Sequence, residues 1–295
     1  MATGTFSQLP RQPFRNEWEE VKPPRVAVIT GGHRFDQEEF RAVFDSLEID
    51  WFQIEHPAAQ TLFSVGAASE IDVFVLYDMP GIEFTGHEPP VRLHQPPDDY
   101  VSNFVALIER GQGMVFLHHA IAGWPAWPRY AEIVGGYFNY QSKGEHRLSQ
   151  PDSGYRHGVR HTVEVVEVDH PVCAGLEPTF EIMDEVYLFT VFEGDITPLM
   201  RSHHIFTADN FYSANLAIRG QRDSSKGWSH PNGSNLVAWA KRAGNSPVVY
   251  LQFGDGPEVY EDANYRKSIG NAISWVSSSG AHDWAAEHPP VQPSN

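Results

Sequence analysis

Two adjacent histidines, His118 and His119, stand at a point in the chain where chemistry is expected. They follow a short apolar run, Met114–Leu117, bounded by glycine, which is typical of a buried strand in a parallel sheet. Open α/β sheets bind ligands at the carboxyl ends of such strands. Imidazoles placed there could serve as catalytic acids and bases. Because neighbouring strand residues face opposite ways, a hydrogen-bonded core role for one of the two is the alternative.

Other side chains with useful chemistry also follow predicted strands. His33 and Asp78 come after two early apolar runs, and Asp255 comes after the last one. Parallel strands bring their carboxyl ends to one edge of a sheet, so we expect His33 and Asp78 to contact a substrate and Asp255 to take part in catalysis. A turn role for His33 and a cap or turn role for Asp78 are the structural alternatives.

Two adjacent acids, Asp184 and Glu185, lie within the apolar segment Phe180–Phe189. A buried carboxylate needs a partner or a function, so we expect these residues to supply a catalytic acid or base. The periodicity of the segment fits a strand or a helix. The sequence leaves open which of the two acids faces the cleft.

Aromatic residues and a further histidine could line a ligand-binding cleft, the aromatics by stacking on a ring of the ligand. These candidates for substrate binding are Trp124, Trp127, Tyr187, Trp228 and His230. Large aromatics fill protein cores by default, so a core role is the alternative for each of them.

A divalent metal could assist the chemistry of these residues. Histidine and carboxylate ligands suit Zn²⁺ or Mn²⁺, and the candidate ligands are His118, His119 and Glu185. The sequence has no HExxH spacing, so the alternative is acid–base chemistry without a metal.

Alternating strands and amphipathic helices position these residues. Apolar or alternating runs predict strands, and apolar residues at helical spacing predict helices. The expected strands are 25–30, 49–54, 71–77, 114–117, 160–168, 196–201, 235–239 and 247–253, and the expected helices are 36–47, 98–110, 265–278 and a short one near 124–130. This alternation predicts an α/β fold with a doubly wound, mostly parallel sheet and helices on both faces.

The chain divides into one domain with two extensions. We expect residues 1–24 to form an extended arm on the surface or on a partner subunit, which could build a homo-oligomer. Residues 25–278 form the single α/β domain, and 279–295 form a loose tail. Residues 82–97 are expected to be a loop over the site. Residues 135–158 are loop-like, and whether they fold over the site as a lid is left open.

The overall charge disfavours several classes of partner. The net charge is −17, without a basic stripe, so nucleic acid and anionic membranes are poor partners. The single cysteine, Cys173, allows no intramolecular disulfide and lies in a turn-like segment without a setting that favours a thiolate. There is no apolar stretch long enough for a signal peptide or a membrane span, so we expect a cytoplasmic protein.

Three segments resemble the ThuA-like (trehalose-utilisation) family. They read GMVFLHHAIAGWPAWPRYAEIVGGYF, HTVEVVEVDHPVCAGLEPTFEIMDEVYLF and NLVAWAKRAGNSPVVYLQFGDGPEVYEDANYRKSIGNAISWV. The resemblance runs from about Arg25 to Val276. It implies a flavodoxin-like sheet related to the class I glutamine amidotransferases, and an association with sugar catabolism that includes 3-keto-sugars.

The residues that carry amidotransferase chemistry are absent. Those enzymes place a cysteine nucleophile at the elbow after the central strand and a histidine two residues before a glutamate after a late strand. Here the elbow carries His118 and His119, and the late strand ends in Asp255-Gly256-Pro257-Glu258. The ThuA-like pattern has a histidine where Asp255 stands, so the chain departs from its own family there. Glutaminase chemistry, which needs the thiolate and its base, is not expected.

Two functions remain open. The first is an enzyme that acts on a small sugar, 3-keto-sugar or glycoside by acid–base chemistry, as a hydrolase, isomerase or lyase, with a metal polarising a carbonyl group as an option. The alternative is a sugar-binding or regulatory module that kept the fold and lost the chemistry. We favour the enzyme.

Overall fold

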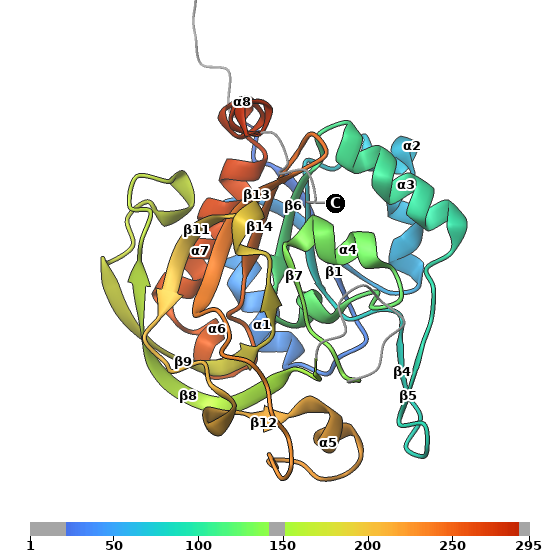
Figure 1. The fold of residues 1–295 in the computed structure, drawn as a ribbon. Coiled ribbons are helices and arrows are strands. Elements are labelled where there is room, and N and C mark those ends of the chain that lie inside the picture. Colours follow the sequence, from blue (N-terminus) through green and yellow to red (C-terminus); the bar gives the residue numbers. More distant parts are fainter. Residues whose placement is uncertain (1–21, 142–150, 289–295) are drawn as a thin grey trace, which may run out of the picture.

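One mixed sheet of ten strands organises the computed structural model, which describes residues 22–141 and 151–288 (Figure 1). Its strands are β1 (Arg25–Gly31), β2 (Asp50–Glu55), β3 (Val73–Asp78), β6 (Gly113–Leu117), β8 (Gly154–Val165), β9 (Thr179–Leu188), β11 (Thr197–Ser202), β12 (Tyr212–Ser213), β13 (Leu236–Ala243) and β14 (Ser246–Leu251). The strand order is β12-β8-β11-β13-β14-β6-β3-β1-β2, and β9 pairs with β8.

Half of this sheet is parallel, in the order β2-β1-β3-β6-β14. This is the order of a flavodoxin-like sheet. Every residue of β3, β6 and β14 is buried, as expected for strands covered on both faces. The predicted α/β fold with a parallel sheet is confirmed.

The other half of the sheet is antiparallel, which the sequence did not predict. A loop of two residues, Gly244 and Asn245, joins β13 to β14, and so short a connection permits only antiparallel pairing. β11, β8, β9 and β12 continue the antiparallel half. The segment of ambiguous periodicity that holds the two acids is the strand β9.

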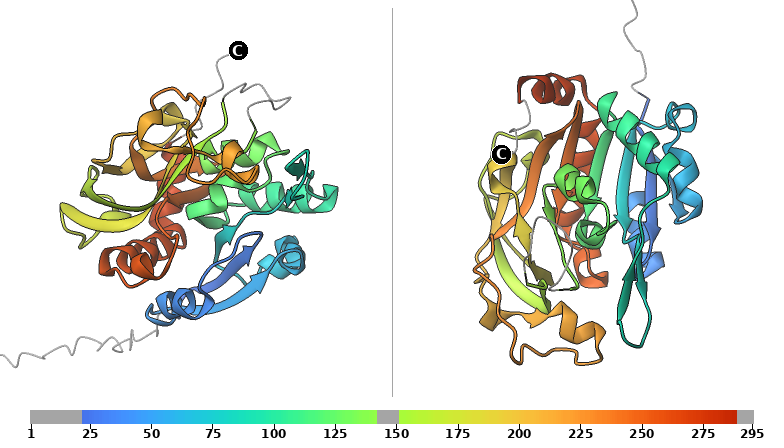
Figure 2. Two further views of the ribbon diagram at one scale, coloured as in Figure 1. Left: turned by 90° about the horizontal axis from the view of Figure 1, so that it is seen from below. Right: turned by 45° about the vertical axis from the view of Figure 1, so that its right-hand side comes forward.

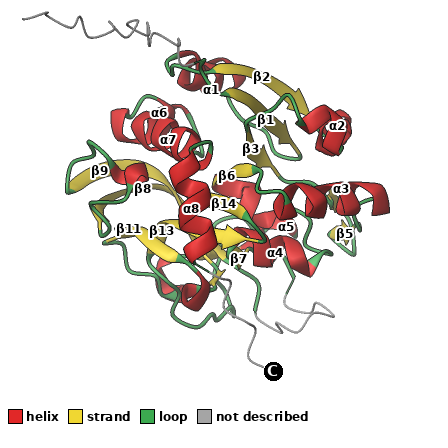
Figure 3. Cartoon of the chain, turned by 90° about the horizontal axis from the view of Figure 1, so that it is seen from above, coloured by secondary structure: helices red, strands yellow, loops and turns green. Residues whose placement is uncertain are grey.

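Helices cover both faces of the sheet (Figure 3). One face carries α1 (Gln37–Asp45), α6 (Pro257–Tyr260), α7 (Ala263–Val276) and α8 (Ser279–Glu287), and the other carries α2 (Val65–Ala68), α3 (Asp98–Glu109) and α4 (Pro128–Val134). In α1, Phe40, Val43 and Phe44 recur at helical spacing and are fully buried, so an amphipathic pattern produces the packing. The predicted layers are confirmed.

Smaller elements complete the chain. They are the hairpin β4 (Ile82–Phe84)–β5 (Val91–Leu93), the pair β7 (Gly136–Tyr137)–β10 (Thr190–Val191), α5 (Ala214–Ile218), and the 3-10 turns η1 (Ala58–Phe63), η2 (His118–Ala122), η3 (Pro171–Cys173), η4 (Glu193–Asp195) and η5 (Ala208–Asn210). Residues 82–97 thus form a hairpin where a loop was expected. This hairpin and α5 lie at the same end of the molecule (Figure 2).

The end of the chain departs from expectation. The predicted loose tail from Ser279 is wrong as far as Glu287, because α8 packs there with Ala281 and Ala285 buried. The Ser278 hydroxyl accepts the Ala281 N–H and caps the helix. Most of the N-terminal arm (1–21) and part of the suspected lid (142–150) lie outside the described residues. None of the described helices has the length and apolarity needed to cross a bilayer.

Candidate functional site

The centre of the candidate site is His118, the first residue after β6. Its φ angle is 47°, in the left-handed region that side chains other than glycine rarely adopt. The chain turns sharply here from strand into η2, and its imidazole is fully buried. A strained backbone of this kind persists only where its surroundings fix it, and such positions cluster at functional sites.

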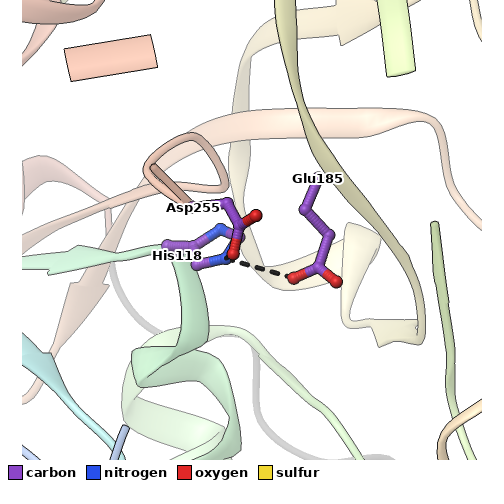
Figure 4. Close-up of side chains that lie close together, drawn as sticks. All are labelled: His118, Glu185 and Asp255. Atoms are coloured by element: carbon purple, nitrogen blue, oxygen red, sulfur yellow. Dashed lines mark ion pairs between the residues drawn. The ribbon is translucent and has the colours of Figure 1, made fainter. Parts of the chain in front are cut away.

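Each nitrogen of the His118 ring has a defined environment, and Figure 4 shows Glu185 and Asp255 beside it. Nδ1 donates to the main-chain oxygen of Gln252 at 2.7 Å, since a carbonyl oxygen can only accept. This leaves Nε2 facing the site. It lies 2.7 Å from Tyr187 Oη, 3.3 Å from Glu185 Oε2 and 3.6 Å from Asp255 Oδ1. Three residues predicted from the sequence therefore meet His118 through one atom.

A β-bulge adds a second histidine to this group. Val186 is in register with Arg156 but Asp184 with Val159, so His157 and Gly158 together oppose Glu185. The bulge brings His157 Nδ1 to 2.9 Å from Glu185 Oε1 and 3.9 Å from Asp255 Oδ2.

The sequence missed the role of His157. The clear alternation of β8 begins only at Arg160, and Gly158 breaks the pattern before it. The alternate residues Tyr155 and His157 were the available signal of a longer strand.

The structure shows which of the two adjacent acids faces the site. Glu185 faces His118, whereas Asp184 accepts three main-chain N–H groups, those of Glu185 (2.8 Å), Gly254 (2.7 Å) and Asp255 (3.0 Å). Burial raises the pKa of Asp184 to about 7, against the influence of the His118 charge and of the Gly254 and Asp255 N–H groups. Asp184 thus holds the turn after β14, and that turn positions Asp255.

The four charged groups of the site shift one another's pKa. Burial acts to lower the pKa of His118, but hydrogen bonds to Asp255 and Glu185 raise it well above the usual range. The same two partners raise the pKa of His157 to about 10. Burial acts to raise the pKa of Glu185 and of Asp255, yet the two histidines hold both below the usual range. At neutral pH the cluster therefore pairs two imidazolium ions with two carboxylates.

Only part of this cluster is open to solvent. The side chains of His157 and Asp255 are 43% and 33% exposed, whereas those of His118 and Glu185 are 0% and 7% exposed. A substrate arriving from solvent would meet His157 and Asp255 first. His118 and Glu185 lie behind them.

The donor set fits a divalent metal. Ligand atoms of His118, Glu185 and Asp255 lie within 4.8 Å of one another, and they form the one such group among the described residues. One imidazole and two carboxylates suit Zn²⁺ or Mn²⁺, and a bound ion would take the place of the proton on His118 Nε2. The predicted ligand set named His119 in place of Asp255, and the structure places Asp255, but not His119, in this group.

His119 and His33 stack beside the cluster. The ring of His119 lies 4.5 Å from that of His33, 4.3 Å from that of Tyr77 and 5.5 Å from that of His118 (centroid distances). Burial, together with the charges of His33 and His118, lowers the pKa of His119 well below its usual range. Neither ring nitrogen of His119 has a hydrogen-bond partner in the described part of the chain. His33 is exposed and its ring lies against that of His119, so it stands at the edge of the site, and its predicted substrate contact stays a prediction.

Asp78 does not reach the cluster. Consecutive strand residues face opposite ways, and Tyr77 faces His119, so Asp78 faces the other helical layer. It is fully buried there, with its Oδ2 2.8 Å from His56 Nε2. The predicted substrate contact of Asp78 is wrong for this reason.

The predicted tryptophan platform is not formed at the site. Trp124 and Trp127 are buried and pack against Tyr100 (5.5 Å) and Phe104 (5.6 Å) of α3, which is the core alternative. Neither is free to stack on a sugar.

The other predicted binding residues divide between the cluster and a separate loop. Trp228 is half-buried, and its Nε1 donates to the main-chain oxygen of Asp152 at 3.0 Å. His230 lies beside it at 5.9 Å between rings. No hydrogen bond or ring contact joins either of them to His118 within the described residues. Of the predicted aromatics, Tyr187 alone joins the cluster.

The cysteine has the environment of a structural residue. Cys173 is buried in η3, and burial raises the pKa of its thiol to about 12. A thiol in that state is a poor nucleophile.

Comparisons with known proteins agree with the fold. The sequence matches the family model for ThuA, described as trehalose utilisation, over residues 25–276. No curated protein matches the sequence. A solved structure described as ThuA-like, from Parabacteroides merdae, has a TM-score of 0.62 at 14% identity and covers 87% of this chain and 91% of that chain.

Two further solved structures are similar. A second one described as ThuA-like, from Bacteroides uniformis, has a TM-score of 0.58 at 17% identity and covers 92% of this chain and 96% of that chain. A cytoplasmic protein from Salmonella typhimurium has a TM-score of 0.52 at 10% identity, covering 86% and 100% of the two chains. At these identities the structures show a shared fold.

Proposed function

The chain belongs to the ThuA (trehalose utilisation) family, and from that premise we propose that it is an enzyme of carbohydrate catabolism acting on a sugar, 3-keto-sugar or glycoside. The residues that would carry the reaction are His118, His157, Glu185 and Asp255. The elbow holds a histidine where a cysteine would be needed, so the proposal does not extend to glutamine hydrolysis.

One observation carries the proposal: two histidines and two carboxylates converge at the carboxyl end of the central strand. Removing ionisable groups from water costs several kcal/mol each, in order of magnitude, so a fold retains them where they act. Strongly shifted pKa values in such a group are typical of functional sites.

The arrangement fits chemistry next to a carbonyl group. A keto-sugar can lose a proton from the carbon beside its carbonyl, which begins isomerisation or elimination. Asp255 is the exposed carboxylate that would accept this proton, and His157 would donate a hydrogen bond to the carbonyl oxygen as negative charge develops. Glu185 and His118 would hold both groups in place.

The acidity of Asp255 sets a requirement on this chemistry. Because its pKa is held below the usual range, Asp255 is a weak base. Positive charge at the carbonyl oxygen must then make the substrate more acidic. A divalent metal bound by His118, Glu185 and Asp255 would supply such charge by polarising the carbonyl.

Elemental analysis of the purified protein, the His118→Ala variant and the His119→Ala variant tests the metal. We expect stoichiometric Zn or Mn in the wild type and in His119→Ala, and its loss in His118→Ala. His119→Ala is the matched control, because it removes the neighbouring imidazole, which lies outside the ligand group. A wild type that binds neither metal after both are supplied would remove the metal from the proposal.

A panel of 3-keto-glucosides then tests the reaction. We expect turnover by the wild type, and a loss of turnover with partly retained affinity in His118→Ala. Saturable binding without turnover of any substrate would contradict the enzyme and support the sugar-binding module instead. A cytoplasmic location and a homo-oligomer built by the N-terminal arm stay predictions from the sequence.

A further inference from the structure

One edge of β8 has a stretch without a partner strand, away from the elbow, while β9 pairs with the other edge. β12 pairs with this strand at Gly154 and Tyr155, and β11 pairs with it at Val163–Val165. The β8 residues from Arg156 to Thr162 are in register with neither strand. The segment from His203 to Asn210 runs beside this gap, and a pocket of about 320 Å³ lies between them. That volume suits a small molecule.

Two histidines line the pocket with unsatisfied nitrogens. His161, from β8, is 6% exposed, and His204 is half-buried. The Nε2 atom of each is buried and has no hydrogen-bond partner within the described residues. Buried polar atoms normally have partners, so two of them in one pocket indicate a ligand.

A neighbouring serine contacts the other ring nitrogen of His161. The Ser202 hydroxyl oxygen accepts the main-chain N–H of His204 at 3.0 Å and lies 2.8 Å from His161 Nδ1. When the hydroxyl donates to Nδ1, the neutral imidazole carries its hydrogen on Nε2. In this tautomer His161 presents a donor to the pocket, which suits an anion.

The charge around the pocket is positive. Arg160 lines it and makes no ion pair with a described residue, and Arg156 lies close enough to influence His204. His203 is paired with Glu164 at 3.2 Å. No carboxylate from the described ranges lines the pocket, although the chain as a whole carries a net charge of −17.

We infer that this pocket binds a small molecule through a carboxylate or phosphate group, held by Arg160, His161 and His204. The guanidinium supplies the charge and the two imidazoles supply neutral donors. The inference is independent of the proposed function, because none of these residues belongs to the cluster at His118.

Calorimetric titration of the full chain with inorganic phosphate, and separately with acetate, tests the inference. Saturable binding of either anion is expected, and the tighter one identifies the group. Arg160→Ala should weaken binding by about tenfold or more, as for the loss of a charge-assisted hydrogen bond. Arg129→Ala is the matched control, since this exposed arginine lies on α4 and should leave the affinity unchanged.

Two further variants test whether the anion binds in this pocket or at the cluster around His118. His161→Phe should lose affinity as Arg160→Ala does, while His118→Ala should retain it. Failure to saturate with either anion, equal binding by Arg160→Ala and the wild type, or loss of binding in His118→Ala would each overturn the inference. The inference would also be overturned if the wild type bound neither anion but bound Zn²⁺, and if His161→Phe lost that Zn²⁺.

Discussion

His157 is the residue whose role depends most on its neighbours. It is partly exposed, held by Glu185, and has a pKa raised to about 10, so it stays protonated over the working range of most enzymes. It can therefore stabilise negative charge on a substrate without having to gain a proton first. The buried His118 supports the same carboxylates from behind.

Replacing His157 tests whether it stabilises negative charge on the substrate. We expect His157→Gln to lower kcat by about 10²-fold or more with a smaller change in KM, because the lost charge acts mainly on the transition state. Steady-state kinetics on the keto-sugar that is turned over measures the effect. His282→Gln, an exposed histidine on α8, is the control and should behave as the wild type. A rise in KM of similar size, with kcat unchanged, would assign His157 to binding alone.

A second histidine prediction concerns pH and stability. His170 is buried, its ring packs 4.5 Å from that of Trp275, and burial lowers its pKa from 6.5 to about 4. The unfolded chain gains a proton near pH 6.5 but the folded chain only near pH 4, so stability is present above pH 6.5 and is lost as the pH falls towards 4. The full effect is about 3 kcal/mol.

The His170→Asn variant should lose less stability over this pH window than the wild type. Asparagine can still accept the Val172 N–H that His170 Nδ1 accepts at 3.3 Å. Urea denaturation at pH 7 and at pH 4.5 measures the difference. His282→Asn should keep the wild-type dependence, and an unchanged dependence in His170→Asn would contradict the assignment.

At the scale of elements, the bulge in β8 places His157. Gly158 has a φ angle of 58°, and a Cβ atom built on it meets nothing within 4 Å. A substitution there is strained by its backbone alone. We expect Gly158→Val to cost about 1–3 kcal/mol and to lower turnover, because relaxing the bulge moves His157 away from Glu185.

Gly220 offers a matched comparison for this variant. Its φ angle is 81°, and it also has no atoms within 4 Å of a built Cβ, but it follows α5. Gly220→Val should therefore lose similar stability in chemical denaturation while keeping its turnover. Equal turnover in both variants would show that the bulge does not position the site.

The sequence predicted the parallel elements well, for a physical reason. Buried strands such as β3 and β6 are continuous apolar runs, and the carboxyl ends of parallel strands meet whatever their side chains. His118 and Asp255 could be placed together on that basis. Glu185 could not, since its position depends on an antiparallel strand and on a bulge opposite it.

Which way a side chain faces was harder to predict. Asp78 and Tyr77 are neighbours on β3, and only the packed layers show that Tyr77 faces the site. The sequence around Trp124 and Trp127 does not distinguish side chains that bind sugar from side chains that fill a core. Aromatic side chains bury large areas, and here α3 supplies the surface that covers them.

At the scale of the whole molecule, α8 closes one face of the sheet beyond the family match. The match ends at residue 276, yet Trp284 packs 5.2 Å from Trp275 of α7. We expect Trp284→Ala to destabilise the protein by about 1–3 kcal/mol through lost apolar burial. Asp283→Ala, at the exposed neighbouring position, should leave the melting temperature unchanged. Equal melting temperatures for the two variants would mean that α8 contributes nothing.

The position of β14 has a consequence for synthesis on the ribosome. β14 lies between β6 and β13, so the strand that pairs with β6 is made more than a hundred residues after it. Until then the nascent chain carries β6 with one edge unpaired, and such an edge invites pairing with other chains. His118, Glu185 and Asp255 meet only after this strand is inserted. The cluster at His118 is therefore completed late in synthesis, and a prematurely terminated chain would carry an unpaired strand edge without this cluster.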